Sequence, residues 1–270
     1  MHLSGSFSKR SSGVHLYALR RFAHASALDI CRWVSRLREI PPSLMAPPRL
    51  TCVEMITALF PGAHPSRVEA CRLELLRDHN FGVALNEKMV EKRLRRINWT
   101  EWHEFLYMAI RFSKPQIVFE TGVFDGLSSA IILRALFENR CGELVSIDLP
   151  ARRTIKCSTH AMPETTIPPD CAPGWLVPDY LRARYHLFLG DSKELLPRLL
   201  SKYPTIDIFF HDSMHTFEHQ YFEYSTSWPH LSDGGLLLSD DILWSPAFHK
   251  FCKEKGKRYF RLEDFGAVRK

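Results

Sequence analysis

From residue 115 onward, short apolar runs alternate with segments whose apolar residues recur every three or four positions. The first pattern predicts strands and the second predicts helices. The apolar runs predict strands over 117–120, 144–148, 185–191, 206–210, 236–238, 259–262 and 266–268. The helical segments between them cover 128–137, 193–200, 217–228 and 246–255. Apolar strands separated by helices form parallel sheets covered on both faces, so we expect a doubly wound, mostly parallel, seven-stranded α/β sheet of the Rossmann-like type.

Helical patterns also precede the predicted sheet. Two capping-box pairs mark helix starts, Thr51 with Glu54 and Ser66 with Glu69. The dipeptide Pro61-Gly62 separates these two helices. Further helices are predicted over 81–96 and 100–112, and the last carries enough apolar surface to dock on a sheet. The chain therefore divides into a basic arm with a Pro-rich linker (1–50), a helical cap as an N-terminal extension (51–113) and the sheet domain (114–270).

The formal net charge of +6 is confined to the arm, because residues 1–50 hold eight Lys or Arg and two acids. The rest of the chain is neutral, so the composition gives no reason to expect a nucleic-acid partner. The arm itself fits a solvated or docking helix, a weak membrane or partner contact, or a targeting segment. Homo-oligomer formation is left open by the sequence.

The seven cysteines are scattered and form no CxxC pair. This pattern favours reduced thiols, and with them a cytoplasmic location, over a disulfide framework or a cysteine-zinc site. The chain has no run of 18 apolar residues, so no transmembrane helix is expected.

A carboxylate follows or ends each of the first five predicted strands. In open α/β sheets, ligands bind beyond the carboxyl ends of the strands. A sheet with a purely structural role has no need of acids at every strand end, so we expect these side chains to line one cleft. They are Glu120, Asp148, Asp191, Asp212, and Asp240 with Asp241.

The turn after the first strand has the pattern E-x-G-x-x-x-G over Glu120–Gly126, and its glycines permit a tight turn and close backbone approach to a ligand. Asp148 at the second strand end can accept two ribose hydroxyls. With the later acids, this spacing resembles class I S-adenosylmethionine-dependent methyltransferases over residues 115–270. The resemblance implies cofactor binding by Glu120, Thr121, Gly122, Phe124, Gly126, Ser128, Ser129, Asp148, Asp191 and Ser192.

Three carboxylates are expected to meet where the fourth and fifth strands end, namely Asp212, Asp240 and Asp241. Packed carboxylates repel unless a cation lies between them, and oxygen ligands suit Mg²⁺ or a similar divalent cation. The arrangement resembles metal-dependent O-methyltransferases, in the branch of macrolide-sugar and rhamnosyl O-methyltransferases and proteins named cephalosporin hydroxylases. This likeness implies that the three acids bind Mg²⁺, with Asp212 and His215 as the catalytic pair and His215 as the base. The acceptor is then a hydroxyl of a small molecule or a sugar.

Other interpretations remain open at this stage. Asp240 and Asp241 could cap the following helix. Three histidines four residues apart, His211, His215 and His219, could hold zinc, although we expect His211 to be structural and His219 to face solvent or an acid. The same carboxylates could serve a hydroxylase or a hydrolase, and a non-catalytic binding protein could use the same fold.

A long, Pro-rich segment separates the second and third predicted strands, over residues 151–183. A connection of this length in a compact domain is usually functional, so we interpret it as a lid or an acceptor-binding wall. Trp175 in this segment could stack on a ring of the acceptor, or it could anchor the loop by packing.

Overall fold

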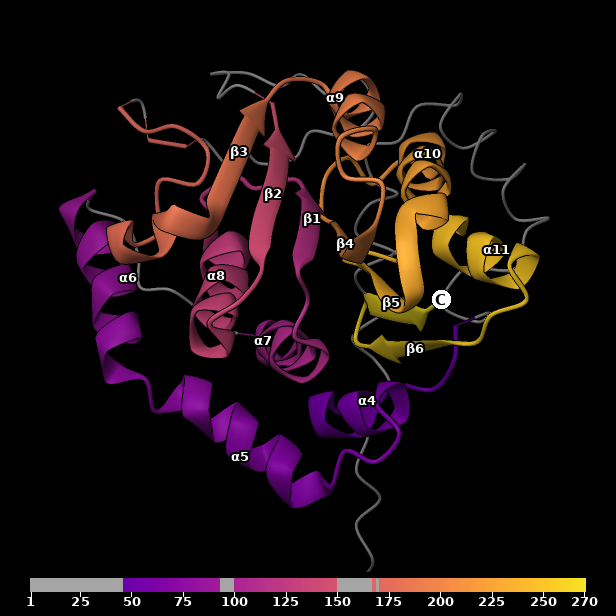
Figure 1. Ribbon diagram of the computed structural model, residues 1–270, viewed down its shortest axis with the longest axis horizontal. Helices are drawn as coiled ribbons and strands as arrows, with labels where there is room; N and C mark the ends of the chain where they lie inside the picture. Colours follow the sequence, from indigo (N-terminus) through magenta and orange to yellow (C-terminus); the bar gives the residue numbers. More distant parts are fainter. Residues whose placement is uncertain (1–45, 93–99, 150–166, 169) are drawn as a thin grey trace, which may run out of the picture. The chain divides into compact units, whose positions relative to one another are not determined.

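The computed structural model describes residues 46–92, 100–149, 167–168 and 170–270 (Figure 1). The described residues belong to one unit of the chain, Met45–Lys270. Residues 1–45 of the predicted arm and linker, residues 93–96 of the predicted 81–96 helix, and residues 151–166 and 169 of the predicted 151–183 segment lie outside the described residues.

Seven strands form one sheet in the order β3-β2-β1-β4-β5-β7-β6. Neighbouring strands among β1 to β5 pair in parallel, whereas β7 runs antiparallel to both β5 and β6. The predicted mostly parallel, seven-stranded sheet is confirmed. The strands are β1 (Ile117–Thr121), β2 (Glu143–Asp148), β3 (Tyr185–Leu189), β4 (Ile206–His211), β5 (Leu231–Ser239), β6 (Tyr259–Leu262) and β7 (Phe265–Arg269).

Helices cover both faces of the sheet because successive strand residues point to opposite sides. In β1, Val118 belongs to the core that packs against α7 (Glu101–Ser113) and α8 (Leu127–Asn139). The next residue, Phe119, belongs to a second core on the other face. That second core contains residues of α9 (Ser192–Leu200), α10 (Phe217–Ser227) and α11 (Ala247–Glu254). Two short 3₁₀ helices lie outside this series: η2 (Asp179–Arg184) precedes β3, and η3 (Trp228–His230) precedes β5.

The predicted helical extension is present as α4 (Cys52–Leu59), α5 (Pro65–Leu76) and α6 (His79–Glu91). The capping box of Thr51 and Glu54 is confirmed. The predicted box of Ser66 and Glu69 is wrong. Pro65 occupies the first helical position, where its missing N–H costs nothing, so His64 becomes the N-cap residue. Glu69 instead forms an ion pair with Arg72.

The Gly234-Gly235 pair, which directly precedes the predicted strand 236–238, lies inside β5. The pairing of β4 with β5 jumps from Ile206↔Leu231 to Ile208↔Leu236, so the intervening residues of β5 form a bulge. Gly234 has a φ of +78°, a conformation that favours glycine. The bulge explains why the strand continues through a dipeptide that usually ends one.

Five of the cysteines lie in the part of the chain that the structure describes, and all five carry free thiols: Cys52, Cys71, Cys141, Cys171 and Cys252. The expectation of reduced cysteines holds for these residues, while Cys31 and Cys157 lie outside the described ranges. Among the described helices, none combines the length and the apolar character needed to cross a bilayer.

Phe265 in β7 ties the closing strands to the helical side of the core. Its buried ring stacks on Trp102, with centroids 5.4 Å apart, and also contacts Phe105 and Phe210. We expect Phe265→Ala to lower the free energy of unfolding by about 3–5 kcal/mol, measured by urea denaturation. Val90→Ala, at a position 71% exposed, should change it by about 0.5 kcal/mol or less. Equal losses in the two variants would contradict this view of the core.

Candidate active site

The carboxyl ends of the central strands lie level with one another. Thr121 at the end of β1 pairs with His211 at the end of β4, which pairs with Ser239 at the end of β5. The ladder continues one residue further, because the Asp212 N–H donates to the Thr121 carbonyl (2.8 Å) and the Asp240 N–H donates to the His211 carbonyl (3.0 Å). The predicted strand-end acids of β1, β4 and β5 are therefore brought to one edge of the sheet.

The glycine turn after β1 packs tightly against two other segments. Gly122 has a φ of +83°, and a Cβ built there would lie 2.0 Å from the backbone oxygen of Asp212. Gly126 has a φ of +94°, and its Cβ would lie 2.7 Å from the Cα atom of Gly174. Both positions therefore require glycine for conformation and for space. The turn is held beside Asp212 by close backbone contact.

Asp148 faces the glycine turn, as the sequence predicts. Its Oδ2 accepts hydrogen bonds from the backbone N–H groups of Val123 (3.0 Å) and Phe124 (2.7 Å). Its Oδ1 accepts one from Leu149 (2.7 Å). Burial raises the pKa of the Asp148 carboxyl above its ordinary value despite these donors. The Phe124 ring, 43% exposed, remains on the surface beside this carboxylate.

Glu120 lies deeper than the other strand-end acids. Its side chain is fully buried, and its carboxylate accepts hydrogen bonds from the hydroxyls of Ser128 (2.6 Å), Ser129 (2.5 Å) and Ser146 (2.7 Å). Burial raises its pKa to about 7, although the hydroxyls oppose this shift. Three residues of the predicted cofactor set, Glu120, Ser128 and Ser129, thus bind one another and fix the strand–turn–helix unit.

The two predicted residues after β3 have different surroundings. Asp191 is exposed and is the N-cap residue of α9, accepting a hydrogen bond from the Lys193 N–H (2.8 Å). Ser192 points inward, and its hydroxyl lies 3.0 Å from Nε2 of the buried His219. The Ser192 side chain is therefore occupied inside the protein, whereas Asp191 lies at the surface beyond the end of β3.

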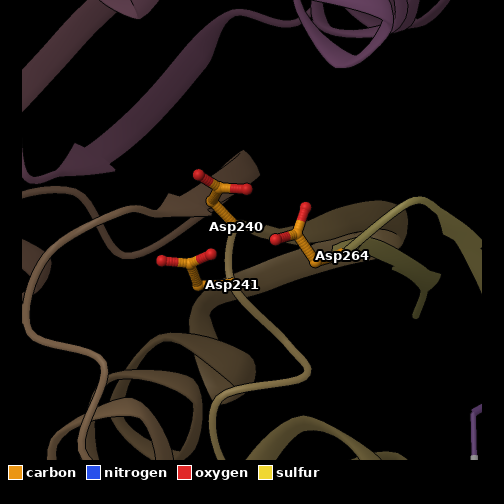
Figure 2. Close-up of side chains that lie close together, drawn as sticks. All are labelled: Asp240, Asp241 and Asp264. Atoms are coloured by element: carbon orange, nitrogen blue, oxygen red, sulfur yellow. The ribbon is translucent and has the colours of Figure 1, made fainter. Parts of the chain in front are cut away.

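Three carboxyl groups gather after β5, as Figure 2 shows: Asp240, Asp241 and Asp264. One carboxylate oxygen from each lies within 4.8 Å of the others. Asp264 comes from the turn between β6 and β7, and its backbone carbonyl accepts from the Ile242 N–H (2.8 Å). Sequence reasoning missed Asp264, because only the antiparallel pairing of β7 with β5 brings this turn to the strand end.

The pKa values of the clustered carboxyls are raised. For Asp240 the pKa rises to about 7, through burial and then repulsion from Asp264. For Asp241 it rises to about 8, through burial and then repulsion from Asp240. Asp212, with a side chain 28% exposed, shifts in the same direction through burial and repulsion from Asp240. Within the described part of the chain, no Lys or Arg forms an ion pair with these carboxyls, and His215 is their one ion-pair partner.

His215 lies between two of the predicted acids. Its Nε2 is 3.5 Å from Oδ2 of Asp241 and 3.8 Å from Oδ1 of Asp212. Burial lowers the pKa of this histidine to about 4, with repulsion from His211 as the next cause. The ring is then neutral at pH 7 and can accept a proton. This geometry agrees with the predicted pairing of His215 with Asp212.

The other two histidines serve a buried carboxylate that sequence reasoning missed. Nδ1 of His211 and Nε2 of His219 lie 2.6 Å and 2.9 Å from the two oxygens of Glu223 in α10. From the sequence we expect His219 to face either solvent or an acid. In the structure it faces an acid and is buried. The sequence feature that points to this contact is the spacing of four residues between His219 and Glu223, which places both side chains on the same face of one helix. The geometry does not favour a zinc site of His211, His215 and His219, because two of them point to Glu223.

Helix capping does not explain Asp240 and Asp241. The helix that follows, α11, begins at Ala247 and has Pro246 as its N-cap residue. Asp241 instead adopts a φ of +52°, a strained conformation for a residue with a side chain. In this conformation the Asp241 carboxylate lies beside His215 and Asp264.

The described end of the segment between β2 and β3 contacts the glycine turn. The N–H groups of Gly174 and Leu176 donate to the carbonyls of Phe124 (3.0 Å) and Asp125 (2.9 Å). Trp175 between them is partly buried and packs against the core, which favours its interpretation as an anchor of the loop. Of the predicted lid segment 151–183, residues 151–166 and residue 169 lie outside the described residues.

Comparison with known proteins adds to this geometry. The model of a family described as a methyltransferase domain matches residues 119–242. No curated protein sequence matches the chain.

Three solved structures have a TM-score of 0.50 against this chain. Cofactor-bound Rv0187 from MTB is 15% identical, and the match covers 76% of this chain and 96% of that protein. A candidate O-methyltransferase from Klebsiella pneumoniae is 12% identical, with 76% and 95% covered. A candidate caffeoyl-CoA O-methyltransferase from Staphylococcus aureus is 14% identical, with 73% and 94% covered. Likeness at these identities establishes the fold.

The matched domain spans the glycine turn, the four strand-end acids from Asp148 to Asp240, and His215. It begins at Phe119 in β1 and ends just after Asp241, so it contains the whole edge of the sheet described above apart from Asp264. Together, the matched methyltransferase domain over residues 119–242 and the seven-stranded sheet show that the chain has the fold of the class I S-adenosylmethionine-dependent methyltransferases.

Proposed function

We propose that the protein transfers the methyl group of S-adenosylmethionine to a hydroxyl of a small molecule or sugar, with help from Mg²⁺ or a similar divalent cation. One observation carries the proposal: His215, neutral at pH 7, lies within 4 Å of carboxylates from two neighbouring strand ends, Asp212 and Asp241. A base beside a cation-binding set of oxygens is what deprotonation of a hydroxyl requires.

The glycine turn supports the position of the methyl donor. Gly122 and Gly126 leave backbone without side chains at the sheet edge, and Asp148 faces the same turn. A carboxylate offers about four acceptor positions, so Asp148 retains capacity for ribose hydroxyls beyond its three backbone donors. The exposed Phe124 and Leu149 on either side of it offer apolar contact to the nucleoside.

The donor atoms at the acidic edge suit a hard divalent cation. Asp212, Asp240 and Asp241 supply carboxylate oxygens, and burial, followed by repulsion from neighbouring carboxyls, raises the pKa of each. When bound, such a cation would lower the pKa of the acceptor hydroxyl and orient its oxygen. In the structure the carboxylate oxygens that lie within 4.8 Å of one another belong to Asp240, Asp241 and Asp264, and Asp212 is not part of that group.

His215 takes the hydroxyl proton in this proposal. Its Nε2 faces the acids, and no hydrogen-bond partner occupies its buried Nδ1 among the described residues. Because the methyl group is already activated on the donor, the protein's task is to hold the hydroxyl oxygen in line with it. Such positioning can supply about 7–11 kcal/mol of the barrier in favourable cases.

The rim around His215 supports an acceptor that carries a ring. Met214 is 46% exposed and Trp244 is 48% exposed, and the Trp244 ring centroid lies 5.9 Å from that of His215. Exposed aromatic surface beside polar groups is typical of ligand sites that bind one apolar face and orient one polar group. A sugar or another ring with a hydroxyl at its edge fits this description.

The alternative of an iron hydroxylase is less well supported. Such sites usually hold the metal with two histidines and one carboxylate. Here His211 and His219 direct nitrogens to Glu223, which leaves His215 as the one histidine at the acidic edge among the described residues. Metal analysis of the purified protein would distinguish the two functions.

Gly122→Ala tests the donor turn. An alanine there combines an unfavourable φ with a clash against the Asp212 carbonyl, and the strain alone costs about 1–3 kcal/mol. We expect calorimetry to show a loss of S-adenosylmethionine affinity of about tenfold or more in the folded variant. Gly82→Ala is the control, because a Cβ there meets no atom within 4 Å and alanine favours helices. Unchanged affinity in Gly122→Ala would remove the turn from the binding site.

His215→Asn tests the base. We expect methyl transfer to fall by about 10²-fold or more, with S-adenosylmethionine affinity unchanged, because general-base catalysis acts in the reaction step. The assay measures S-adenosylhomocysteine formed with a panel of ring-bearing sugars and phenols. His186→Asn, at a side chain 41% exposed on an edge strand, is the matched control. A His215 variant with wild-type turnover would rule out this base.

The raised pKa values of Asp240 and Asp241 predict how stability depends on pH. Between the ordinary value of 3.8 and the folded values of about 7 and about 8, the folded protein binds more protons than the unfolded chain. Stability in the presence of chelator should therefore fall as the pH rises through this window. Above it, at pH about 8.5, MgCl₂ should raise the thermal unfolding midpoint by offsetting the repulsion.

Asp240→Asn should weaken both the pH dependence and the MgCl₂ effect, because it removes one charge from the cluster. The exposed Asp233→Asn, seven residues earlier in β5, should leave both unchanged. A MgCl₂ effect of the same size in all three proteins would show that the ion acts elsewhere.

A further inference from the structure

Glu223 in α10 has a carboxylate side chain with no exposure at all. Its Oε2 accepts from the Thr121 hydroxyl (2.5 Å) and lies 2.6 Å from Nδ1 of His211. Its Oε1 accepts from the Ser213 hydroxyl (3.0 Å) and lies 2.9 Å from Nε2 of His219. Four partners from three segments of the chain therefore meet at one carboxylate.

This carboxylate is stable in the core because its partners favour the charged form. Burial alone would raise the pKa of Glu223, yet hydrogen bonds to His211 and His219 lower it below its ordinary value. A buried charge with satisfied partners is costly to disturb, because removing a partner leaves part of the charge uncompensated. The network therefore resists displacement of the segments that it holds.

The partners of Glu223 lie next to the functional positions. Thr121 immediately precedes Gly122, where the donor turn begins. His211 and Ser213 stand on either side of Asp212. His219 is in the first turn of α10, just after the loop that carries His215. One carboxylate thus holds the start of the donor turn and both ends of the segment with the acid and the base.

We infer that Glu223 is a positioning residue that couples the donor turn to the Asp212–His215 segment. The inference rests on the proposed function, because it assumes that S-adenosylmethionine binds at the Gly122 turn. Glu223 reaches neither the donor nor the acceptor. It acts by fixing Thr121 and Ser213, whose backbones form the wall between the two halves of the site.

Precise spacing is the reason such a residue matters. Transfer in line between two bound groups is sensitive to displacements of about 1 Å, which can lower the rate by about 10²-fold. Site residues keep their geometry when further hydrogen bonds hold the residues around them. The loop from Asp212 to Thr216 joins the end of β4 to the start of α10. Glu223 adds a side-chain hydrogen bond within this loop, through the hydroxyl of Ser213.

A double-mutant cycle tests the coupling. Thr121→Val and Ser213→Ala each remove one hydroxyl from Glu223 without removing the carboxylate, and calorimetry measures S-adenosylmethionine affinity in folded protein. We expect each single variant to lose about fivefold in affinity. If both act through Glu223, the double variant should lose about fivefold to tenfold, well short of the product of the two losses.

Glu223→Gln gives the second arm. In this background, Ser213→Ala should have no further effect on S-adenosylmethionine affinity, because the charge that it contacts is already gone. If Glu223→Gln does not fold, the cycle of Thr121 and Ser213 decides alone. Tyr107→Phe is the control, since it removes a hydrogen bond of a fully buried tyrosine to Glu74, away from the site. It should lower the unfolding midpoint and leave the affinity unchanged.

The outcomes separate the inference from the function on which it rests. Wild-type protein that does not bind S-adenosylmethionine refutes the proposed function. Wild-type binding with strictly additive losses, or with unchanged affinity in Ser213→Ala, overturns the role of Glu223 and leaves the function intact. Non-additive losses, with an unaffected Tyr107→Phe, support the coupling.

Discussion

The close approach of two backbones determines the geometry of the whole site. Parallel strands lie about 4.8 Å apart, and β1 and β4 end at the same level. The chain leaves β1 through Gly122, against the carbonyl of Asp212, where no side chain fits. The Gly122 turn and the loop that carries Asp212 therefore share a wall of backbone. Their separation is set by the sheet, which is the most rigid part of the fold, and depends little on the loops.

The carboxyls around this wall are all at least partly buried, and burial raises the pKa of each. The hydrogen-bond and charged partners of each carboxyl therefore decide the direction in which its pKa finally shifts. Glu223 has four partners, two of them histidines, and its pKa is lowered. Glu120 has three hydroxyl donors, which are too weak to overcome burial, so its pKa rises to about 7. Asp240 and Asp241 face other acids, and their pKa values rise. Among the described residues of this group, the carboxyls that face other acids thus lie beyond the ends of β4 and β5.

The sequence was sufficient for the features that follow from local patterns. Apolar runs mark the strands, and parallel neighbours end level, so the alignment of the β4 and β5 strand ends and the direction of Asp148 could be predicted. Asp264 could not, because it depends on the antiparallel pairing of a hairpin with β5. Glu223 could not be predicted either. A histidine followed one helical turn later by an acid usually forms an exposed pair on the helix surface, and the sequence does not show that this pair is buried. The false capping box at Ser66 shows how one proline moves a helix start.

The three histidines show why spacing alone does not define a site. His211, His215 and His219 are four residues apart, which on one helix would place them on one face. The chain is a strand at the first, a loop at the second and a helix at the third. The first and last therefore converge on Glu223 from two elements, while the middle one is left beside Asp212 and Asp241. A pattern that suggests a metal-binding triplet instead directs two histidines to Glu223 and leaves one beside two aspartates, because the change of secondary structure within nine residues separates their directions.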